Sequence, residues 1–338
     1  MRKICYIEPS KSGVSYHRLE VPFAKLSENK EFEYFSLNGF SNENLPTEFD
    51  IIVLNRLSQQ AEPYLEMAKE KGVKIILDLD DDIELPSWHM GYEHLTEPIV
   101  RQRIIDTIKI ADVVWCASEY LANKVSQYND NVIVVPNAID FNQPQFKPQK
   151  IHNKRKIIGY IGAANHHQDL SLLQPNLSKL LNQKNYELLY SGVDDEKSMY
   201  WQFVFNVFSS NNNLPYDQLH AIKHTNAYNY AFNYNLIDIA LAPLEDNEFN
   251  RCKSNLKILE AGAFGLPIIC SNVEPYKDFI KKCLVIQLGK LDKQINDLLK
   301  NPKKIEIMGK NLQKYVKENY NIETINKLRY DSIIDLLD

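Results

Sequence analysis

The sequence predicts an α/β protein with two doubly wound parallel sheets, and three observations lead to this prediction. The chain has 338 residues, enough for two domains of about 150 residues each. Short apolar runs alternate with longer amphipathic stretches along its length, which is typical of parallel strands covered by helices. A polar stretch rich in Pro, Gln and Lys, from Gln143 to Lys156, divides the runs into two series and is the candidate linker.

The first series has five apolar runs that we expect to be strands. They are residues 3–7, 51–54, 74–77, 113–116 and 132–135. An early helix is expected to bury Leu19, Phe23 and Leu26 on one stripe. Later helices are expected at 60–71, 97–110 and 118–127. Ser118 is a suitable N-cap for the last of these helices.

The second series repeats this alternation. Its expected strands are residues 157–162, 187–190, 237–241, 267–270 and 284–286. The tail from 306 to 338 is expected to be helical, in two segments that are broken near 319–321. Two open α/β sheets of this kind bind ligands at the carboxyl ends of their strands, and two such edges facing each other would form a cleft.

The composition excludes several classes of protein. Hydrophobic residues make up 44% and charged residues 25% of the chain, the balance of a soluble globular protein. A net charge of −5 argues against a protein that coats nucleic acid. We find no run of eighteen apolar residues and no signal peptide, and the five cysteines are scattered without a CxxC pair. We therefore expect a cytoplasmic chain with reduced cysteines.

The most informative segment runs from Asn250 to Ser271. Ser254 is a good N-cap, and Leu256, Leu259 and Ala263 form an apolar stripe behind it. Gly265 is expected to end the helix, and the Pro267 that follows prevents its continuation. The segment therefore predicts a loop, one short helix, a tight turn and a buried strand.

The polar side chains of this segment suit a nucleotide. Arg251, Lys253 and Lys257 gather near the helix start, where unpaired N–H groups and the helix dipole also favour a phosphate. Glu260 lies six residues after Ser254, which is ~9 Å along a helix axis. A carboxylate there can accept two hydrogen bonds from a ribose diol. The alternative is a solvated basic helix start with an ordinary Lys257–Glu260 pair.

Three blocks resemble the GT-B glycosyltransferases, specifically glycosyltransferase family 4. The block 250–271 resembles the family's donor-binding motif, and 134–140 (VVPNAID) resembles the segment that ends its first domain. The block 157–162 (IIGYIG) resembles the strand and glycine turn that open its second domain. Gly13, followed by Tyr16, His17 and Arg18, lies where the family has its first glycine loop.

The resemblance implies two Rossmann-like domains facing a cleft, with a C-terminal helix that returns to the first domain. The acceptor-side domain would comprise 1–145 and about 318–338, and the donor domain 151–317. The resemblance also implies a nucleotide-sugar donor such as a UDP sugar, retention of anomeric configuration and no required metal or other cofactor. Glu260 matches the glutamate that holds the ribose. The predicted donor-binding residues are Gly13, His17, Arg18, Asn165, His166, Arg251, Lys253, Ser254, Asn255, Leu256, Lys257 and Glu260.

Two departures from the family pattern affect the donor contacts. The family often has a second glutamate eight positions before the first, and Cys252 stands there in this chain. It also often has an Arg and a Lys in the loop after the second domain's first strand, where this chain has residues 163–169 (AANHHQD). Either His166, Arg251 or Lys253 supplies the missing charge, or the donor binds differently.

An acidic string from Asp78 to Asp82 follows a buried strand. Asp-x-Asp can hold a divalent cation, and the alternative is a solvated, capping loop. We expect Asp80 or Asp81 to contact the acceptor hydroxyl, with His89 nearby contacting the sugar or acceptor. These three are the candidate catalytic residues, and Trp88 is suited to stack on a sugar face.

The predicted function is transfer of a hexose from a nucleoside-diphosphate sugar to an acceptor hydroxyl in surface-saccharide synthesis. The acceptor would be a saccharide or a lipid-linked saccharide, with the enzyme cytoplasmic or peripheral at the inner membrane face. One alternative acceptor is a hydroxymethylated base in phage-type DNA. An alternative of another class is a non-catalytic protein that binds nucleotide sugars, which the missing glutamate and the altered 163–169 loop suggest.

Overall fold

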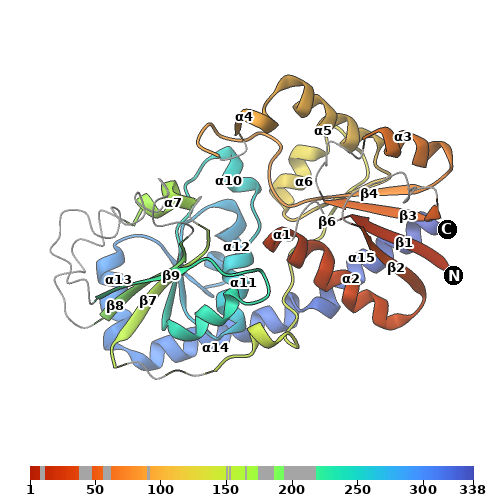
Figure 1. The fold of residues 1–338 in the computed structure, drawn as a ribbon. Coiled ribbons are helices and arrows are strands. Elements are labelled where there is room, and N and C mark those ends of the chain that lie inside the picture. The colour runs from red at the N-terminus through yellow and green to blue at the C-terminus, as the bar shows by residue number, and fades with distance from the viewer. Residues whose placement is uncertain are drawn as a thin grey trace. The chain divides into compact units, whose positions relative to one another are not determined.

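The computed structural model divides the chain into two compact units (Figure 1). It describes residues 1–7, 12–37, 48–55, 62–89, 92–149, 151, 154–163, 166–173, 186–193 and 218–338. The first unit comprises Met1–Ala138, Arg251–Ser254 and Asn321–Asp338. The second unit comprises Ile139–Asn250 and Asn255–Tyr320.

The first unit contains a six-stranded sheet in which every pair of neighbouring strands is parallel. In chain order its strands are β1 (Arg2–Ile7), β2 (Phe32–Leu37), β3 (Ile51–Asn55), β4 (Lys74–Leu79), β5 (Val113–Cys116) and β6 (Val132–Val134). Their order across the sheet is β2-β1-β3-β4-β5-β6. The central strand β3 is buried along its whole length, because helices cover a parallel sheet on both faces.

The helices of the first unit confirm the predicted apolar stripe, since Leu19, Phe23 and Leu26 are all buried. These helices are α1 (Gly13–Ser15), α2 (Val21–Leu26), α3 (Glu62–Glu70), α4 (Tyr92–Leu95), α5 (Pro98–Ile110), α6 (Glu119–Val125) and α15 (Ile322–Leu337). A π-helical turn, η1 (Tyr16–Glu20), joins α1 to α2, and a 3-10 turn, η2 (Ser27–Asn29), follows α2. Ser118 caps α6 as predicted, accepting a hydrogen bond from the Leu121 N–H. The C-terminal helix α15 belongs to this first unit, as the resemblance implied.

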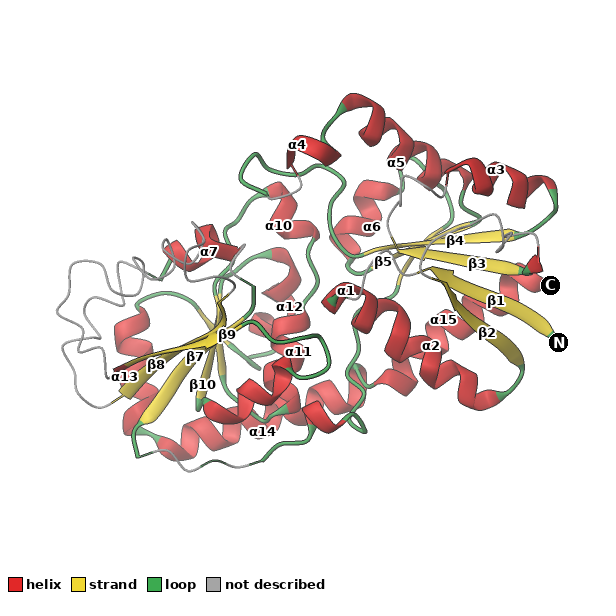
Figure 2. Ribbon diagram, in the orientation of Figure 1, coloured by secondary structure: helices red, strands yellow, loops and turns green. Residues whose placement is uncertain are grey.

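The second unit contains another parallel six-stranded sheet (Figure 2). Its strands are β7 (Lys156–Ile161), β8 (Tyr186–Val193), β9 (Leu219–Lys223), β10 (Ile239–Ala242), β11 (Ile268–Cys270) and β12 (Ile286–Gln287). Their order is β12-β11-β10-β7-β8-β9. Two parallel sheets with helices confirm the predicted α/β, doubly wound fold class.

The helices of the second unit include two short 3-10 segments. The elements are η4 (Pro144–Phe146), α7 (His167–Ser171), η7 (Tyr230–Leu236), α10 (Glu248–Cys252), α11 (Leu256–Ala263), α12 (Glu274–Lys281), α13 (Leu291–Lys300) and α14 (Pro302–Asn319). The last two residues of α10 belong to the first unit. The predicted break in the tail is confirmed between α14 and α15, where the Asn321 side chain accepts a hydrogen bond from the Thr324 N–H.

The sequence prediction missed β2 and β9, and both are edge strands. Only Phe32 is buried in β2, and no residue of β9 is buried. An edge strand with an exposed face carries no continuous apolar run, so the pattern that revealed the inner strands is missing.

The boundary between the units falls at Ala138, before the predicted linker. Gln145 and Phe146 in that stretch are buried. The Gln145 side chain donates to the Ala227 carbonyl at 2.9 Å and accepts from the Ala231 N–H at 3.3 Å. This part of the predicted linker is therefore packed into the second unit. The residues at 150, 152 and 153 lie outside the described residues.

Glycines bring α11 close to α14, and the two helices pack side by side. A Cβ on Gly262 would lie 2.6 Å from Val316 Cγ2, and one on Gly309 would lie 1.8 Å from the Gly265 carbonyl oxygen. Larger side chains at these positions would push the helices apart. This packing fixes α11, which carries the candidate donor-binding residues.

Candidate functional site

The helix α11 begins one residue later than the sequence predicted. Asn255, rather than Ser254, is its N-cap, and no side chain caps it. Leu256 is half-buried, whereas every residue from 258 to 263 is buried. Gly265 ends the helix with φ +66°, the left-handed conformation that glycine adopts without strain.

Glu260 is the buried carboxylate of this helix, with 3% of the residue exposed. Tyr230 donates a hydrogen bond to Oε1, and Tyr234 donates to Oε2 at 2.8 Å. Burial raises the pKa of Glu260, and the nearby positive charge of Lys257 and the two tyrosine hydroxyls oppose that rise. The two tyrosine hydroxyls thus hold the carboxylate in one orientation.

Lys257 lies one turn before Glu260 and reaches the carboxyl end of β7. Its Nζ donates to the Ile161 carbonyl at 2.9 Å and lies 4.6 Å from the centre of the Tyr160 ring. A Cβ on Gly162 would lie 2.3 Å from this ammonium group. The lysine therefore places a positive charge at the strand end where α/β sheets bind ligands.

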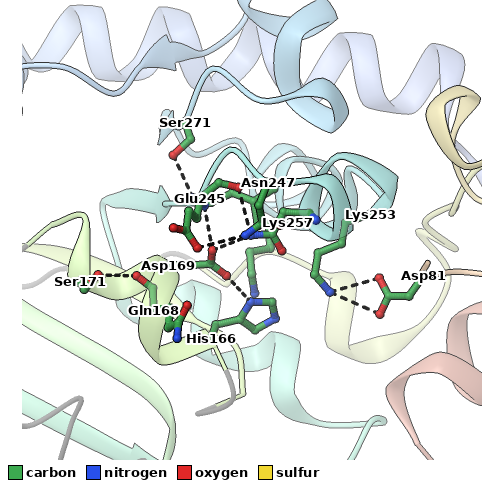
Figure 3. A network of polar contacts seen from close by, with 12 residues as sticks. Asp81, His166, Gln168, Asp169, Ser171, Glu245, Asn247, Lys253, Lys257 and Ser271 are labelled. Atoms are coloured by element: carbon green, nitrogen blue, oxygen red, sulfur yellow. Dashed lines mark hydrogen bonds and ion pairs between the residues drawn. The ribbon is translucent and has the colours of Figure 1, made fainter. Parts of the chain in front are cut away.

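A buried carboxylate, Asp169, joins three segments of the second unit (Figure 3). Its Oδ2 lies 2.8 Å from His166 Nδ1. Its Oδ1 accepts from the Glu245 N–H at 2.8 Å and from the Asn250 side chain at 2.9 Å. Only 1% of Asp169 is exposed. His166 and Asp169 lie in the altered 163–169 loop, but the sequence gave no reason to connect them with Glu245 and Asn250.

The same network continues to the neighbouring strand β11. Ser271, directly after β11, accepts a hydrogen bond through its hydroxyl from the Leu244 N–H at 2.8 Å. Strands β11, β10 and β7 are neighbours in the sheet, so hydrogen bonds tie together the loops that follow all three. The carboxyl edge of this sheet is therefore braced around the position of Lys257.

Lys253 belongs to the first unit, whereas Lys257 belongs to the second. Its Nζ donates to both carboxylate oxygens of Asp81, at 3.1 and 3.3 Å. Its neighbour Cys252 is buried in the apolar core of the first unit. Ser254 accepts a hydrogen bond from the Asn137 side chain at 2.9 Å. We therefore do not include Lys253 and Ser254 in the proposed diphosphate contacts.

The other acidic-loop residues differ in their surroundings. Asp82 is buried and pairs with Lys124 at 2.6 Å, whereas Asp80, at the carboxyl end of β4, is half-buried. His89 and Trp88 are also half-buried, with their ring centres 6.3 Å apart. The structure thus leaves Asp80, Asp81 and His89 near the surface of the first unit, where their catalytic role stays a prediction.

Arg18 has a structural setting that the sequence did not predict. Its guanidinium binds both oxygens of Asp78, at 2.9 and 2.5 Å, and also donates to the Val135 carbonyl and the Asn137 side chain. It is 1% exposed and Asp78 is fully buried. Because the guanidinium is buried and already donates to these protein acceptors, we do not include Arg18 among the proposed phosphate contacts.

His17 is also buried in the first unit. Burial, aided by the charge of Arg18, lowers the pKa of His17 to about 3. The imidazole is therefore neutral at physiological pH, so it lacks the positive charge that attracts a diphosphate.

The remaining predicted donor residues are less constrained by the structure. Gly13 begins α1, and a Cβ added there would meet no atom within 4 Å, so the backbone is open to close approach. Arg251 is half-buried and belongs to the first unit. Asn165 lies outside the described residues.

Among the described residues, no group of three or more His, Cys, Asp and Glu side chains is arranged to hold a metal ion. In the same parts of the chain, no helix combines the length and apolar character needed to cross a lipid bilayer.

Comparison with known proteins gives similarity in structure only. No protein-family model and no curated sequence matches the chain. The structure resembles sucrose-phosphate synthase from Thermosynechococcus elongatus, with TM-score 0.73, 13% identity, and coverage of 100% of this chain and 99% of that one. It also resembles a glycosyltransferase from Rickettsia africae, with TM-score 0.70, 13% identity, and coverage of 100% and 99%.

A third similar structure is HepE from Anabaena in complex with UDP-glucose. Its TM-score is 0.67 at 13% identity, with 99% of this chain and all of that chain covered. Together these likenesses show that the chain has the GT-B fold of nucleotide-sugar glycosyltransferases. At this identity they show the fold alone.

Proposed function

We propose that the protein is a glycosyltransferase that moves a hexose from a nucleoside-diphosphate sugar to an acceptor hydroxyl, with retention of anomeric configuration. The proposal places this reaction in surface-saccharide synthesis, with a saccharide or lipid-linked saccharide acceptor on the cytoplasmic side. The GT-B fold supports the general reaction, and one structure with this fold is described in complex with UDP-glucose.

The observation that carries the proposal is the placement of Lys257 and Glu260 on α11. They lie one turn apart, ~4.5 Å along the helix axis. Lys257 presents its ammonium at the carboxyl end of β7, and Glu260 holds a carboxylate among tyrosine hydroxyls. A diphosphate beside Lys257 and its ribose diol at Glu260 would match the charge and hydrogen-bonding capacity of this pair.

The chemistry requires stabilisation of the departing diphosphate. Cleavage of the anomeric C–O bond leaves positive charge on the sugar ring and negative charge on the diphosphate. The fixed positive charge of Lys257 stabilises that negative charge without reorganisation of solvent. The proposed role of Glu260 is to fix the nucleoside by accepting hydrogen bonds from the ribose hydroxyls, as a carboxylate oriented by two tyrosines can.

On the acceptor side, the proposal assigns Asp80 or Asp81 to the acceptor hydroxyl and His89 to the sugar or acceptor. All three lie after β4 in the first unit. A carboxylate that accepts the hydroxyl proton makes the oxygen a better nucleophile. The proposed reaction uses no metal, so chelation with EDTA should leave turnover unchanged.

A thermal-shift screen against UDP-, GDP-, ADP- and CMP-sugars tests the donor class. We expect one nucleotide family to raise the melting temperature, and transfer of its hexose to a saccharide acceptor with release of the nucleoside diphosphate. Nuclear magnetic resonance of the product then gives its anomeric configuration. Binding without turnover on saccharide, lipid-linked or hydroxymethylated DNA acceptors would favour a non-catalytic binding protein. Failure of all four donor classes to bind would overturn the proposal.

A further inference from the structure

We propose that Asp169 is a positioning residue that holds His166 for contact with the donor's diphosphate. This inference rests on the proposed function and assigns to it a residue that the sequence did not single out. The observation behind it is a buried carboxylate with an imidazole on one oxygen and two fixed donors on the other.

The first observation is that the carboxylate of Asp169 is buried. Its side chain is 1% exposed, and a buried carboxylate requires compensation by hydrogen bonds and a partner charge. The donors on Oδ1 are a backbone N–H and an amide, which are both neutral. Among the described residues, His166 is the side chain paired with it that can carry a positive charge, which it does when its ring is protonated.

The geometry of the pair is the second step. Because a carboxylate only accepts hydrogen bonds, His166 Nδ1 must carry the proton in this contact. The ring then turns Nε2 away from Asp169, and Nε2 is a donor when the imidazole is protonated. Asp169 itself cannot rotate freely, because Glu245 and Asn250 hold its other oxygen. The network thus fixes both the tautomer and the direction of the ring.

The location of the pair is the third step. His166 lies in the loop after β7, and Lys257 reaches the end of the same strand. This loop lacks the Arg and Lys that the resemblance implied. A diphosphate at this edge would therefore meet a permanent charge from Lys257 and, when the His166 ring is protonated, an oriented N–H donor at its Nε2. The pair thus places an oriented hydrogen-bond donor in a loop that contains no Arg or Lys.

A double-mutant cycle of His166→Asn and Asp169→Asn tests the inference. The probes are UDP, GDP and ADP, titrated calorimetrically, with circular dichroism to verify folding. We expect each single variant to weaken binding of the preferred nucleotide about tenfold, and the double variant to bind no more weakly than the His166 variant. The variant His220→Asn is the matched control, because His220 pairs with Glu187 at 2.7 Å in the same unit but is exposed.

Two results would overturn the inference while leaving the proposed function intact. If His166→Asn binds nucleotide normally while Lys257→Met does not, His166 is outside the site. If the effects of the two substitutions add, Asp169 acts only by bracing the Glu245–Asn250 segment. If the native protein binds none of the three nucleotides, the proposed function fails and this inference fails with it.

Histidine NMR supplies a readout that a bracing role would not change. Above the pH at which the ring loses its second proton, we expect neutral His166 to keep its proton on Nδ1 in the native protein and to lose this preference in Asp169→Asn. Asp169→Glu should restore part of both the tautomer preference and the nucleotide affinity. An unchanged tautomer in Asp169→Asn would contradict the positioning role.

Discussion

Lys253 donates to both carboxylate oxygens of Asp81, although 172 positions separate the two residues in the sequence. The side chains are 17% and 19% exposed, so the pair is shielded from water more than a surface ion pair. This contact attaches the short 251–254 segment to the loop that follows β4.

The first prediction concerns this ion pair. We expect Asp81→Asn and Lys253→Met each to lower the free energy of unfolding by about 1 kcal/mol. This value lies at the upper end of the range for exposed ion pairs, because the pair is partly buried. The charge-reversed double variant Asp81→Lys/Lys253→Asp should recover most of the melting temperature. It should not recover turnover, because the carboxylate proposed to contact the acceptor has moved. Full recovery of turnover would restrict Asp81 to a structural role.

The second prediction concerns the cost of burying Glu260. Burial raises the pKa of Glu260 above its ordinary value of 4.5. Between the unfolded and folded pKa values the folded state binds more protons, so stability falls as pH rises through this window. We expect Glu260→Gln to raise the melting temperature at pH 7 and to leave it nearly unchanged at pH 4, while nucleotide binding weakens.

Thermal unfolding of Glu260→Gln from pH 4 to pH 8 measures this effect. Glu274→Gln is a suitable control because Glu274 lies partly exposed on α12 of the same unit. A melting temperature that falls equally at pH 4 and pH 7 would show that the tyrosine hydrogen bonds to the carboxylate outweigh its desolvation.

The third prediction separates Lys257 from other lysines of the second unit. We expect Lys257→Met to weaken binding of the preferred nucleoside diphosphate by at least about tenfold, the usual range for a charge-assisted contact. Loss of this ammonium should also raise the pKa of Glu260 further, since Lys257 now lowers it. Lys281→Met is the control, as Lys281 is 74% exposed on α12. Equal affinities for the two variants would remove Lys257 from the donor site.

The inner strands of both sheets could be predicted because local physics determines them. Runs such as residues 51–54 are apolar throughout, since helices cover both faces of the sheet. The start of a helix could likewise be predicted where one side chain caps the backbone, as Ser118 does at the start of α6. The edge strands β2 and β9 lack such runs, and only the finished sheet identifies them.

The candidate site could be predicted only where its residues are neighbours in the sequence. Lys257 and Glu260 share a helix face, so their spacing alone brought them together. Asp169 and Asn250 are 81 positions apart, and their contact depends on how the loops after β7 and β10 meet. No local sequence pattern predicts that contact. The contacts of Lys253 and Arg18 with acidic partners are hidden from the sequence for the same reason.

The last prediction uses His17 to test the acid stability of the first unit. Burial lowers its pKa from the ordinary value of 6.5 to about 3. Between these values the unfolded chain binds a proton at His17 and the folded chain does not, so the native protein loses stability as pH falls below about 6.5.

In His17→Gln this contribution is absent. We therefore expect the variant's melting temperature to decline less than the native protein's between pH 7 and pH 4, whatever the difference at pH 7. His220→Gln, at an exposed position in the second unit, serves as the control. If the melting temperatures of the native protein and His17→Gln decline equally between pH 7 and pH 4, His17 accepts a proton as readily in the folded state as in the unfolded state. That result would contradict the burial of His17 as a neutral imidazole.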